Sequence, residues 1–482
     1  MLNAKHDQKH LRYKDNYAYP FYFIFAFCII FSALAAKADD ISPQTSNGPG
    51  AVVYISNIEI YGELVTRPEV LKRFIVFEAG DPLDTSAIRI TRGNLIRTQL
   101  FQKVDILTHM REDGAHIFII LKEAVRLSLN YSGQYGTHKY GNDKLWWSVH
   151  LNAGLSNFRG QLEELSFGVS FWEYRGLSAY WHKPFLSTPY FIRAGAAISA
   201  YPDERLPLDY RDISARMTAG RYIGRYSQIS LSAIPVHRNR TLKEKFVIID
   251  DTLVIPLVIG RDIYEAFGVL GVVNDLRSSR FDPQSGWFLR TEISTNRLYY
   301  DQTLPFWQLR NEFRYYQPLF FDDMAVLRIS ATLRDGDAGT YHRLLYGDAG
   351  QIRGYNSKAL GWRFVANSSV LASVKYHKPV WRAQAARMPL VNTVYSGVNE
   401  LSYRIDAALI ADYARLYNNP QGILHLKGPW QSGTGLGGGI RVVIPEIKIS
   451  GCADLVYGRR DVKKGSGHEW KPVLHGYLDM FY

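Results

Sequence analysis

Cysteine is almost absent from this chain, whose 482 residues include only Cys28 and Cys452. Two cysteines so far apart exclude a disulfide framework and a cysteine-based metal site. Lysine and arginine form no continuous run, which argues against nucleic acid as a partner despite the net charge of +12. The chain also lacks a Ser/His/Asp arrangement with a recognisable context and a phosphate-binding loop. We therefore expect no enzyme and no cofactor.

Long apolar runs are missing after the N-terminus. Residues 21–36 form one short apolar run, which follows a basic segment and ends at Ala36-Lys37-Ala38. This order predicts a secretory signal peptide over residues 1–38 and a polar tether over residues 39–51. The alternative for the apolar run is a membrane-anchoring helix, but such a helix needs about 20 apolar residues.

Aromatic residues, by contrast, are abundant and make up 14% of the chain. This content is typical of proteins that place rings at a membrane–water interface. An aromatic-rich soluble core explains it equally well. The modest positive charge suits contact with acidic lipid headgroups or polyanions.

Residues 52–124 carry the pattern of a small α/β domain. The expected order is strand, helix, helix, strand, strand: a strand over 53–60, helices over 66–79 and 84–98, and strands over 104–110 and 116–121. Thr66 and Glu69 form a capping box for the first helix, and Asp84 caps the second. Asp113-Gly114 predicts a hairpin turn between the last two strands.

Residues 125–482 alternate between apolar and polar side chains. In one such segment Leu165, Phe167 and Val169 alternate with Ser166, Gly168 and Ser170. This period predicts strands with one apolar and one polar face. A soluble sandwich also alternates, but the signal peptide, the aromatic content and the repeated segment length favour a transmembrane antiparallel β-barrel. Such a sheet must close, and the stretch has room for about sixteen strands, an even number.

The small N-terminal domain resembles the polypeptide-transport-associated (POTRA) domain. The marks that carry the resemblance are Ile58, Gly62, Gly80-Asp81-Pro82-Leu83, Leu95, Leu100-Phe101, Val104, Leu121 and Glu123. The resemblance implies a domain that binds unfolded chains by adding a strand at the edge of its sheet, over 104–110 or 53–60.

The rest of the chain resembles the BamA/TamA outer-membrane assembly superfamily, also called the bacterial surface antigen family. One mark is a strand–turn–strand motif with Asp275, Arg277, Phe281, Pro283 and Gly286, and another is the loop motif Arg353-Gly354-Tyr355. The glycine-rich stretch 433–443 and the terminal strand 473–482, which ends in Tyr482, fit the last strands of the family.

This resemblance implies that the loop arginine, Arg353, reaches into the lumen and pairs with a carboxylate on an inward strand face. The family motif F-x-D-x-G matches residues 410–414 with its aspartate, Asp412, retained. Asp412 is therefore the expected partner, and Asp406, on the same face by parity, is the second candidate. Lys375 stands where the family often has glutamate.

The resemblance further implies a bacterial outer-membrane protein with its POTRA domain in the periplasm. The expected function is assembly, insertion or translocation of unfolded outer-membrane or secreted polypeptides, with periplasmic accessory proteins as further partners. A dedicated two-partner-type secretion pore for one client and a passive barrel without a client are the alternatives.

Overall fold

The computed structural model describes most residues between Val52 and Leu478. The gaps lie at residues 99, 125, 138–144, 173, 186, 203–207, 224–225, 243–246, 250–251, 255–261, 280–281, 301–305, 336–343, 346–352, 354–364, 367, 387–400, 418–429, 445–448 and 462–467. The expected signal peptide and tether lie outside the described residues, as do Phe281, Gly354, Tyr355 and Tyr482.

A small three-stranded sheet comes first in the chain. It contains β1 (Ile55–Tyr61), β2 (Phe101–Arg111) and β3 (Gly114–Glu123) in the order β1-β3-β2. β1 is parallel to β3 and β2 is antiparallel to it. The helices α2 (Pro68–Lys72) and α3 (Thr85–Arg97) connect β1 to β2. As expected, both candidate client strands lie at edges of this sheet.

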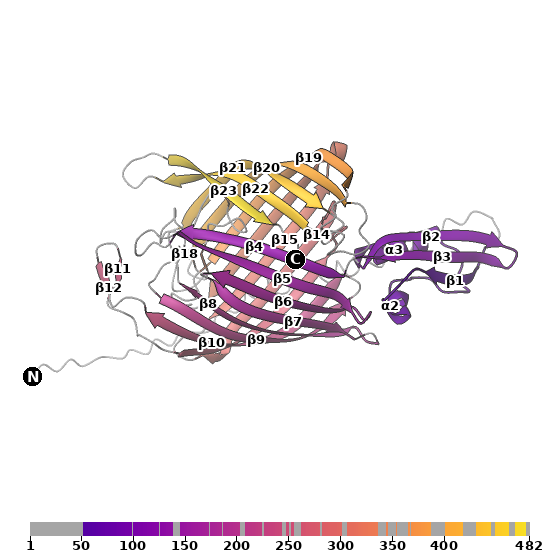
Figure 1. Ribbon diagram of the computed structural model, residues 1–482, viewed down its shortest axis with the longest axis horizontal. Helices are drawn as coiled ribbons and strands as arrows, with labels where there is room; N and C mark the ends of the chain where they lie inside the picture. Colours follow the sequence, from indigo (N-terminus) through magenta and orange to yellow (C-terminus); the bar gives the residue numbers. More distant parts are fainter. Residues whose placement is uncertain are drawn as a thin grey trace, which may run out of the picture. The chain divides into compact units, whose positions relative to one another are not determined.

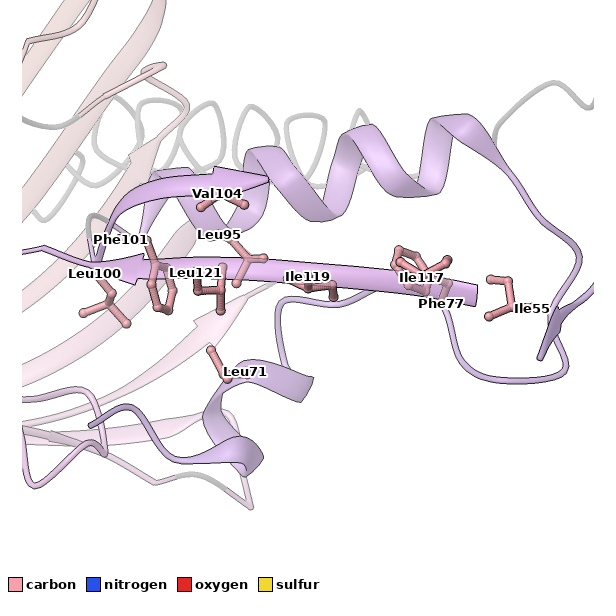
Figure 2. Packing of buried hydrophobic residues seen from close by; sticks show 10 residues of the cluster. All are labelled: Ile55, Leu71, Phe77, Leu95, Leu100, Phe101, Val104, Ile117, Ile119 and Leu121. Atoms are coloured by element: carbon pink, nitrogen blue, oxygen red, sulfur yellow. The ribbon is translucent and has the colours of Figure 1, made fainter. Parts of the chain in front are cut away.

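The core of this domain contains side chains from the strands, the helices and the segments that join them (Figure 2). Its buried members are Ile55, Leu71, Phe77, Leu95, Leu100, Phe101, Val104, Ile117, Ile119 and Leu121. Ile58 packs against this cluster. Gly62 has φ +141°, and a Cβ atom there would lie 2.1 Å from the carbonyl oxygen of Leu121. The family marks therefore serve packing and a close backbone approach.

The two helices differ from expectation in one respect. Asp84 caps α3 as predicted, because its side chain accepts a hydrogen bond from the Ser86 amide at 2.7 Å. The capping box predicted for the first helix is wrong. α2 begins at Pro68 without a side-chain cap, and the Thr66 hydroxyl donates to Glu123 at 2.5 Å instead. Proline at the first helical position starts the helix there, and α2 ends after five residues.

Within the described part of the chain, the remaining long strands form one antiparallel sheet of sixteen strands, in agreement with the expected number of about sixteen. They are β4 (Leu127–Thr137), β5 (Leu145–Phe158), β6 (Glu163–Trp172), β7 (Arg175–Pro184), β8 (Tyr190–Pro202), β9 (Leu208–Ile223), β10 (Ser227–Leu242), β13 (Asp262–Asp275), β14 (Gly286–Tyr300), β15 (Trp307–Pro318), β16 (Met324–Asp335), β19 (Ser368–Ala386), β20 (Leu401–Tyr417), β21 (Trp430–Ile444), β22 (Ile449–Asp461) and β23 (His468–Leu478). The sheet winds into a barrel (Figure 1).

Short elements complete the fold. Two small hairpins, β11 (Val247–Ile249) with β12 (Thr252–Val254) and β17 (Leu344–Leu345) with β18 (Val365–Ala366), lie in the connections β10–β13 and β16–β19. A 3-10 turn, η1 (Phe320–Asp322), joins β15 to β16. Among the described residues, no helix is long and apolar enough to cross a membrane.

The barrel strands have the two faces that the alternation predicts. Large apolar side chains on one face are exposed, such as Phe167 at 60%, Met217 at 65% and Leu231 at 63%. The other face carries buried charged groups, among them Asp412 at 3% exposure. Apolar residues therefore point outward and charged residues point into the lumen, as in a barrel that faces lipid.

The first and last strands, β4 and β23, close the barrel differently from the other neighbours. Each consecutive pair in the sheet is joined by a hydrogen-bonded ladder, and the order of these ladders ends at β4 on one side and β23 on the other. β4 and β23 nevertheless lie next to each other (Figure 1). Within the described strands, this junction is therefore a seam without a ladder.

Candidate functional site

Arg353 lies in the long connection between β16 and β19, and its side chain is buried in the lumen at 6% exposure. It forms a two-pronged ion pair with Asp412 of β20. Nε donates to Oδ2 at 2.8 Å, and Nη2 donates to Oδ1 at 2.6 Å. The backbone amide of Arg353 also donates to Asp412 Oδ2, at 3.0 Å. Forked, charge-assisted bonds of this kind fix both the position and the orientation of a guanidinium.

Two further strands hold the same guanidinium. Nη2 donates to Ser373 Oγ of β19 at 2.6 Å, and Nη1 lies 3.4 Å from Asp454 Oδ2 of β22. Lys375 Nζ lies 3.5 Å from the same Asp454 oxygen. We call Arg353, Ser373, Lys375, Asp412 and Asp454 the Arg353 cluster. It places two cations against two carboxylates, so the buried charges balance.

A glycine-rich strand, β21, makes room for this cluster. A Cβ atom on Gly435 would lie 2.3 Å from the Arg353 carbonyl oxygen, and one on Gly439 would lie 2.0 Å from Asp454 Oδ1. Any side chain at these two positions would collide with the cluster. The glycines of the 433–443 stretch therefore shape the lumen wall where the Arg353 loop is seated.

Asp406 was the second candidate for the carboxylate that pairs with Arg353, but it does not contact Arg353. It pairs with Arg404 on its own strand at 2.7 Å and lies 3.9 Å from Arg441 of β21. Asp406 is six residues from Asp412, about 20 Å along an extended strand, so one arginine cannot reach both. The second carboxylate at Arg353 is Asp454, which the sequence analysis missed. Its signal was present, since Asp454 stands alone between apolar residues of an alternating strand.

A second cluster holds the turn between β13 and β14, residues 276–285, which we call the inner turn. At its base Arg277 Nε donates to Asp275 Oδ1 at 2.7 Å, and Pro283 is buried. Gly286 has φ +97°, and a Cβ atom there would lie 2.2 Å from the Leu276 carbonyl oxygen. These four motif residues therefore fix the shape of the turn.

The tip of the inner turn reaches strands that are not its neighbours in the sheet. Asp282 accepts hydrogen bonds from Arg404 of β20 at 2.8 and 3.0 Å and from Arg441 of β21 at 3.2 Å. Four strands separate β13 from β20 in the sheet order. The inner turn therefore crosses the lumen at the end of the barrel where β4 begins, and sequence spacing gave no signal of this contact.

The chemistry of both clusters is that of attachment. The charged groups pair with one another, and among the described residues no His/Cys/Asp/Glu group could hold a metal ion. Both clusters attach a connecting segment to the wall formed by β19–β22. Such an arrangement can hold and release parts of the chain.

The comparisons with known proteins agree with this architecture. Residues 146–445 match the Omp85 superfamily domain. No curated protein matches the sequence. The fold is similar to BamA from Haemophilus ducreyi lacking POTRA domains 1–3, with a TM-score of 0.53, 16% identity and coverage of 90% of this chain and 86% of that one. It is also similar to CdiB from Acinetobacter baumannii, with a TM-score of 0.52, 14% identity and coverage of 89% and 74%.

Proposed function

The chain belongs to the Omp85 superfamily of outer-membrane barrels, which are not enzymes, and from this premise we propose that it assembles, inserts or translocates unfolded polypeptides at the outer membrane. Its small domain receives the client, and its barrel opens to pass the client on. Release of the Arg353 cluster accompanies this opening.

The observation that carries the proposal is the seam between β4 and β23. Both strands present backbone N–H and C=O groups that no described ladder between them satisfies. Unpaired strand edges recruit other strands, and unpaired backbone groups are costly in hydrocarbon. A client strand that pairs with β4 or β23 would remove this cost, so the seam can template a β-strand.

The Arg353 cluster supports a controlled opening. It connects the β16–β19 loop to β20 and β22, which lie close to the seam in the strand order. Displacing the loop would leave Asp412 and Asp454 buried with fewer cations, which is unfavourable. The cluster therefore favours the closed lumen until client binding offsets its loss.

The free edge of β2 supports client reception by the small domain. Leu107 and Met110 on this strand are exposed at 54% and 56%. An extended client segment can add to such an edge through backbone hydrogen bonds while apolar side chains contact it. A photocrosslinker at Leu107 should capture nascent outer-membrane or secreted chains, and a scan of both edges without any such product would contradict this part.

Depletion of the protein followed by outer-membrane proteomics tests the proposal as a whole. General loss of barrel proteins would identify an assembly factor, and loss of one secreted protein would identify a dedicated pore. An unchanged outer membrane would refute both and leave the passive barrel.

A disulfide staple tests the seam itself. Cysteine pairs placed across β4 and β23 should stop client insertion when oxidised and restore it when reduced. The matched control is the pair Ala453→Cys and Gly476→Cys, which are opposite each other in the β22–β23 ladder. Equal activity of oxidised seam and control pairs would show that the seam stays closed during function.

A further inference from the structure

The lumen wall formed by β14, β15 and β16 carries an arginine-rich patch that the proposed function does not use. It contains Arg290, Glu292, Arg310, Glu312, Arg314 and Arg328, which we call the arginine patch. Residues directly opposite each other in a ladder share a face, and Arg314 is opposite Arg328, which is opposite Ser373 of the Arg353 cluster. The arginine patch therefore faces the lumen.

The carboxylates of the patch satisfy only part of its positive charge. Glu312 pairs with Arg314 at 2.7 Å and with Arg328 at 3.0 Å, while Glu292 pairs with Arg290 at 2.9 Å. Arg310 is exposed, and no carboxylate is paired with it among the described residues. Counting only the described residues of the patch, four guanidinium groups lie beside two carboxylates, which gives a net charge of +2.

The strands on either side do not neutralise this excess. On β13 the residues opposite the patch are Gly271, Val273 and Asp275, and Asp275 is already paired with Arg277. On β19 the residues opposite the patch strand β16 are Ser369, Leu371 and Ser373, which are uncharged. Among the described residues, these two strands therefore add no free carboxylate to the patch: Asp275 is paired with Arg277, and Ser373 already accepts a hydrogen bond from Arg353.

We infer that the arginine patch is a binding site for acidic segments of polypeptide in the lumen. Guanidinium groups bind carboxylates through paired N–H bonds, and arginine suits this role better than lysine. The patch extends over the rows of Arg314, Arg290 and Arg310, with about 6.8 Å between successive rows on one face of a strand. An extended acidic segment repeats its own side chains at the same spacing.

The choice of a polypeptide as ligand rests on the proposed function, whereas the anion preference of the wall does not. Charged side chains that line a pore select ions of opposite charge. The full chain in planar bilayers, under a potassium chloride gradient, should therefore pass chloride in preference to potassium. Recording from the Asp412→Asn variant measures the same chloride preference in a barrel whose Arg353 loop is released.

Substitution of the exposed arginine tests the site. Arg310→Glu should lower the chloride-to-potassium permeability ratio by about twofold or more, because charged walls concentrate counter-ions. The matched control is Arg221→Glu, the same charge change at an exposed residue whose strand neighbours Ala219 and Met217 lie on the outward face. Equal effects of the two variants, a cation-selective barrel, or no conductance in either protein would overturn the inference.

A peptide block identifies the ligand. Decaglutamate should reduce the current through the barrel, decalysine should not, and Arg310→Glu should weaken the decaglutamate block by about tenfold. Chloride selectivity without a decaglutamate block would overturn the assignment to acidic polypeptide. These recordings need no client, so they stay separate from the outcome of the depletion experiment.

Discussion

Gly435 of β21 and Arg353 of the β16–β19 loop touch backbone to backbone. A Cβ atom on Gly435 would lie 2.3 Å from the Arg353 carbonyl oxygen and 3.2 Å from the carbonyl carbon. Since these are main-chain atoms, no side-chain rotation can relieve the collision. The loop is therefore seated on a surface that only glycine provides.

Gly435→Ala should therefore displace the Arg353 loop while leaving the barrel folded. Packing an extra methyl group against fixed backbone costs about 1–3 kcal/mol. We expect faster hydrogen exchange at the Arg353 amide, which donates to Asp412 in the native chain. Ser432→Ala, at an exposed residue of the same strand, is the control. Unchanged exchange in Gly435→Ala would mean that the loop does not depend on this contact.

Asp412→Asn should release Arg353 to trypsin. The substitution removes the carboxylate that accepts three hydrogen bonds from Arg353. Breaking a buried ion pair costs about 3–5 kcal/mol, so the loop should leave the lumen far more often. Mass spectrometry of the fragments should detect cleavage after Arg353.

Asp406→Asn is the matched control for this cleavage. Asp406 is a buried carboxylate of the same strand and face, but it pairs with Arg404 and Arg441. The Asp406→Asn variant should be cleaved after Arg353 to the same extent as the wild type. If Asp412→Asn also resisted trypsin as well as the wild type does, the role assigned to the Arg353–Asp412 pair would be refuted.

Asp282→Asn should loosen the inner turn. The substitution removes the negative charge that pairs with Arg404 and Arg441, and both arginine side chains are largely buried. Removing one partner of a buried charge network costs about 3–5 kcal/mol. The temperature at which the folded barrel loses its distinct mobility in SDS gels should fall. Asp322→Asn makes the same change in an exposed ion pair with Arg382 and should leave this temperature unchanged.

Leu95→Ala should destabilise the small domain by about 2–5 kcal/mol, the usual cost of deleting a buried leucine side chain. Leu95 is fully buried in the core, whereas its neighbour Ile96 is 46% exposed. Ile96→Ala is therefore a control on the same helix. Hydrogen exchange of the β3 amides in the full chain should rise only in Leu95→Ala, and equal rates in both variants would contradict the packing described above.

The sequence predicted features that depend on local order along one strand or helix. The alternation in β20 placed Asp406 and Asp412 on the inward face, because successive side chains of a strand point to opposite faces. The alternation in β6 likewise indicated that Phe167 points outward, and its side chain is 60% exposed. Asp84 was identified as a helix cap from its position alone.

The sequence failed where a contact depends on how distant strands are aligned. Asp454 reaches Arg353 because β22 lies two strands from β20 in a particular register, and periodicity carries no information about register between strands. The capping box at Thr66 failed for a similar reason. Glu123, 57 residues later, accepts the Thr66 hydroxyl and competes with the local pattern.

The contact between Lys375 and Asp454 leads to the last prediction. Asp454 Oδ2 lies 3.5 Å from Lys375 Nζ and 3.4 Å from Arg353 Nη1, so two cations share this carboxylate oxygen. Asp454→Asn should therefore leave two buried cations with one carboxylate, which is unfavourable. We expect increased trypsin cleavage after Arg353.

The double variant Lys375→Met/Asp454→Asn restores the balance of one cation, Arg353, against one carboxylate, Asp412. Residues that share a charge network show coupling energies of about 0.5–3 kcal/mol in double-mutant cycles. The double variant should therefore resist trypsin better than Asp454→Asn alone, since the uncompensated lysine has been removed. If the effects of the two substitutions on trypsin cleavage were additive, Lys375 and Asp454 would act independently. Asp454 would then stabilise Arg353 alone.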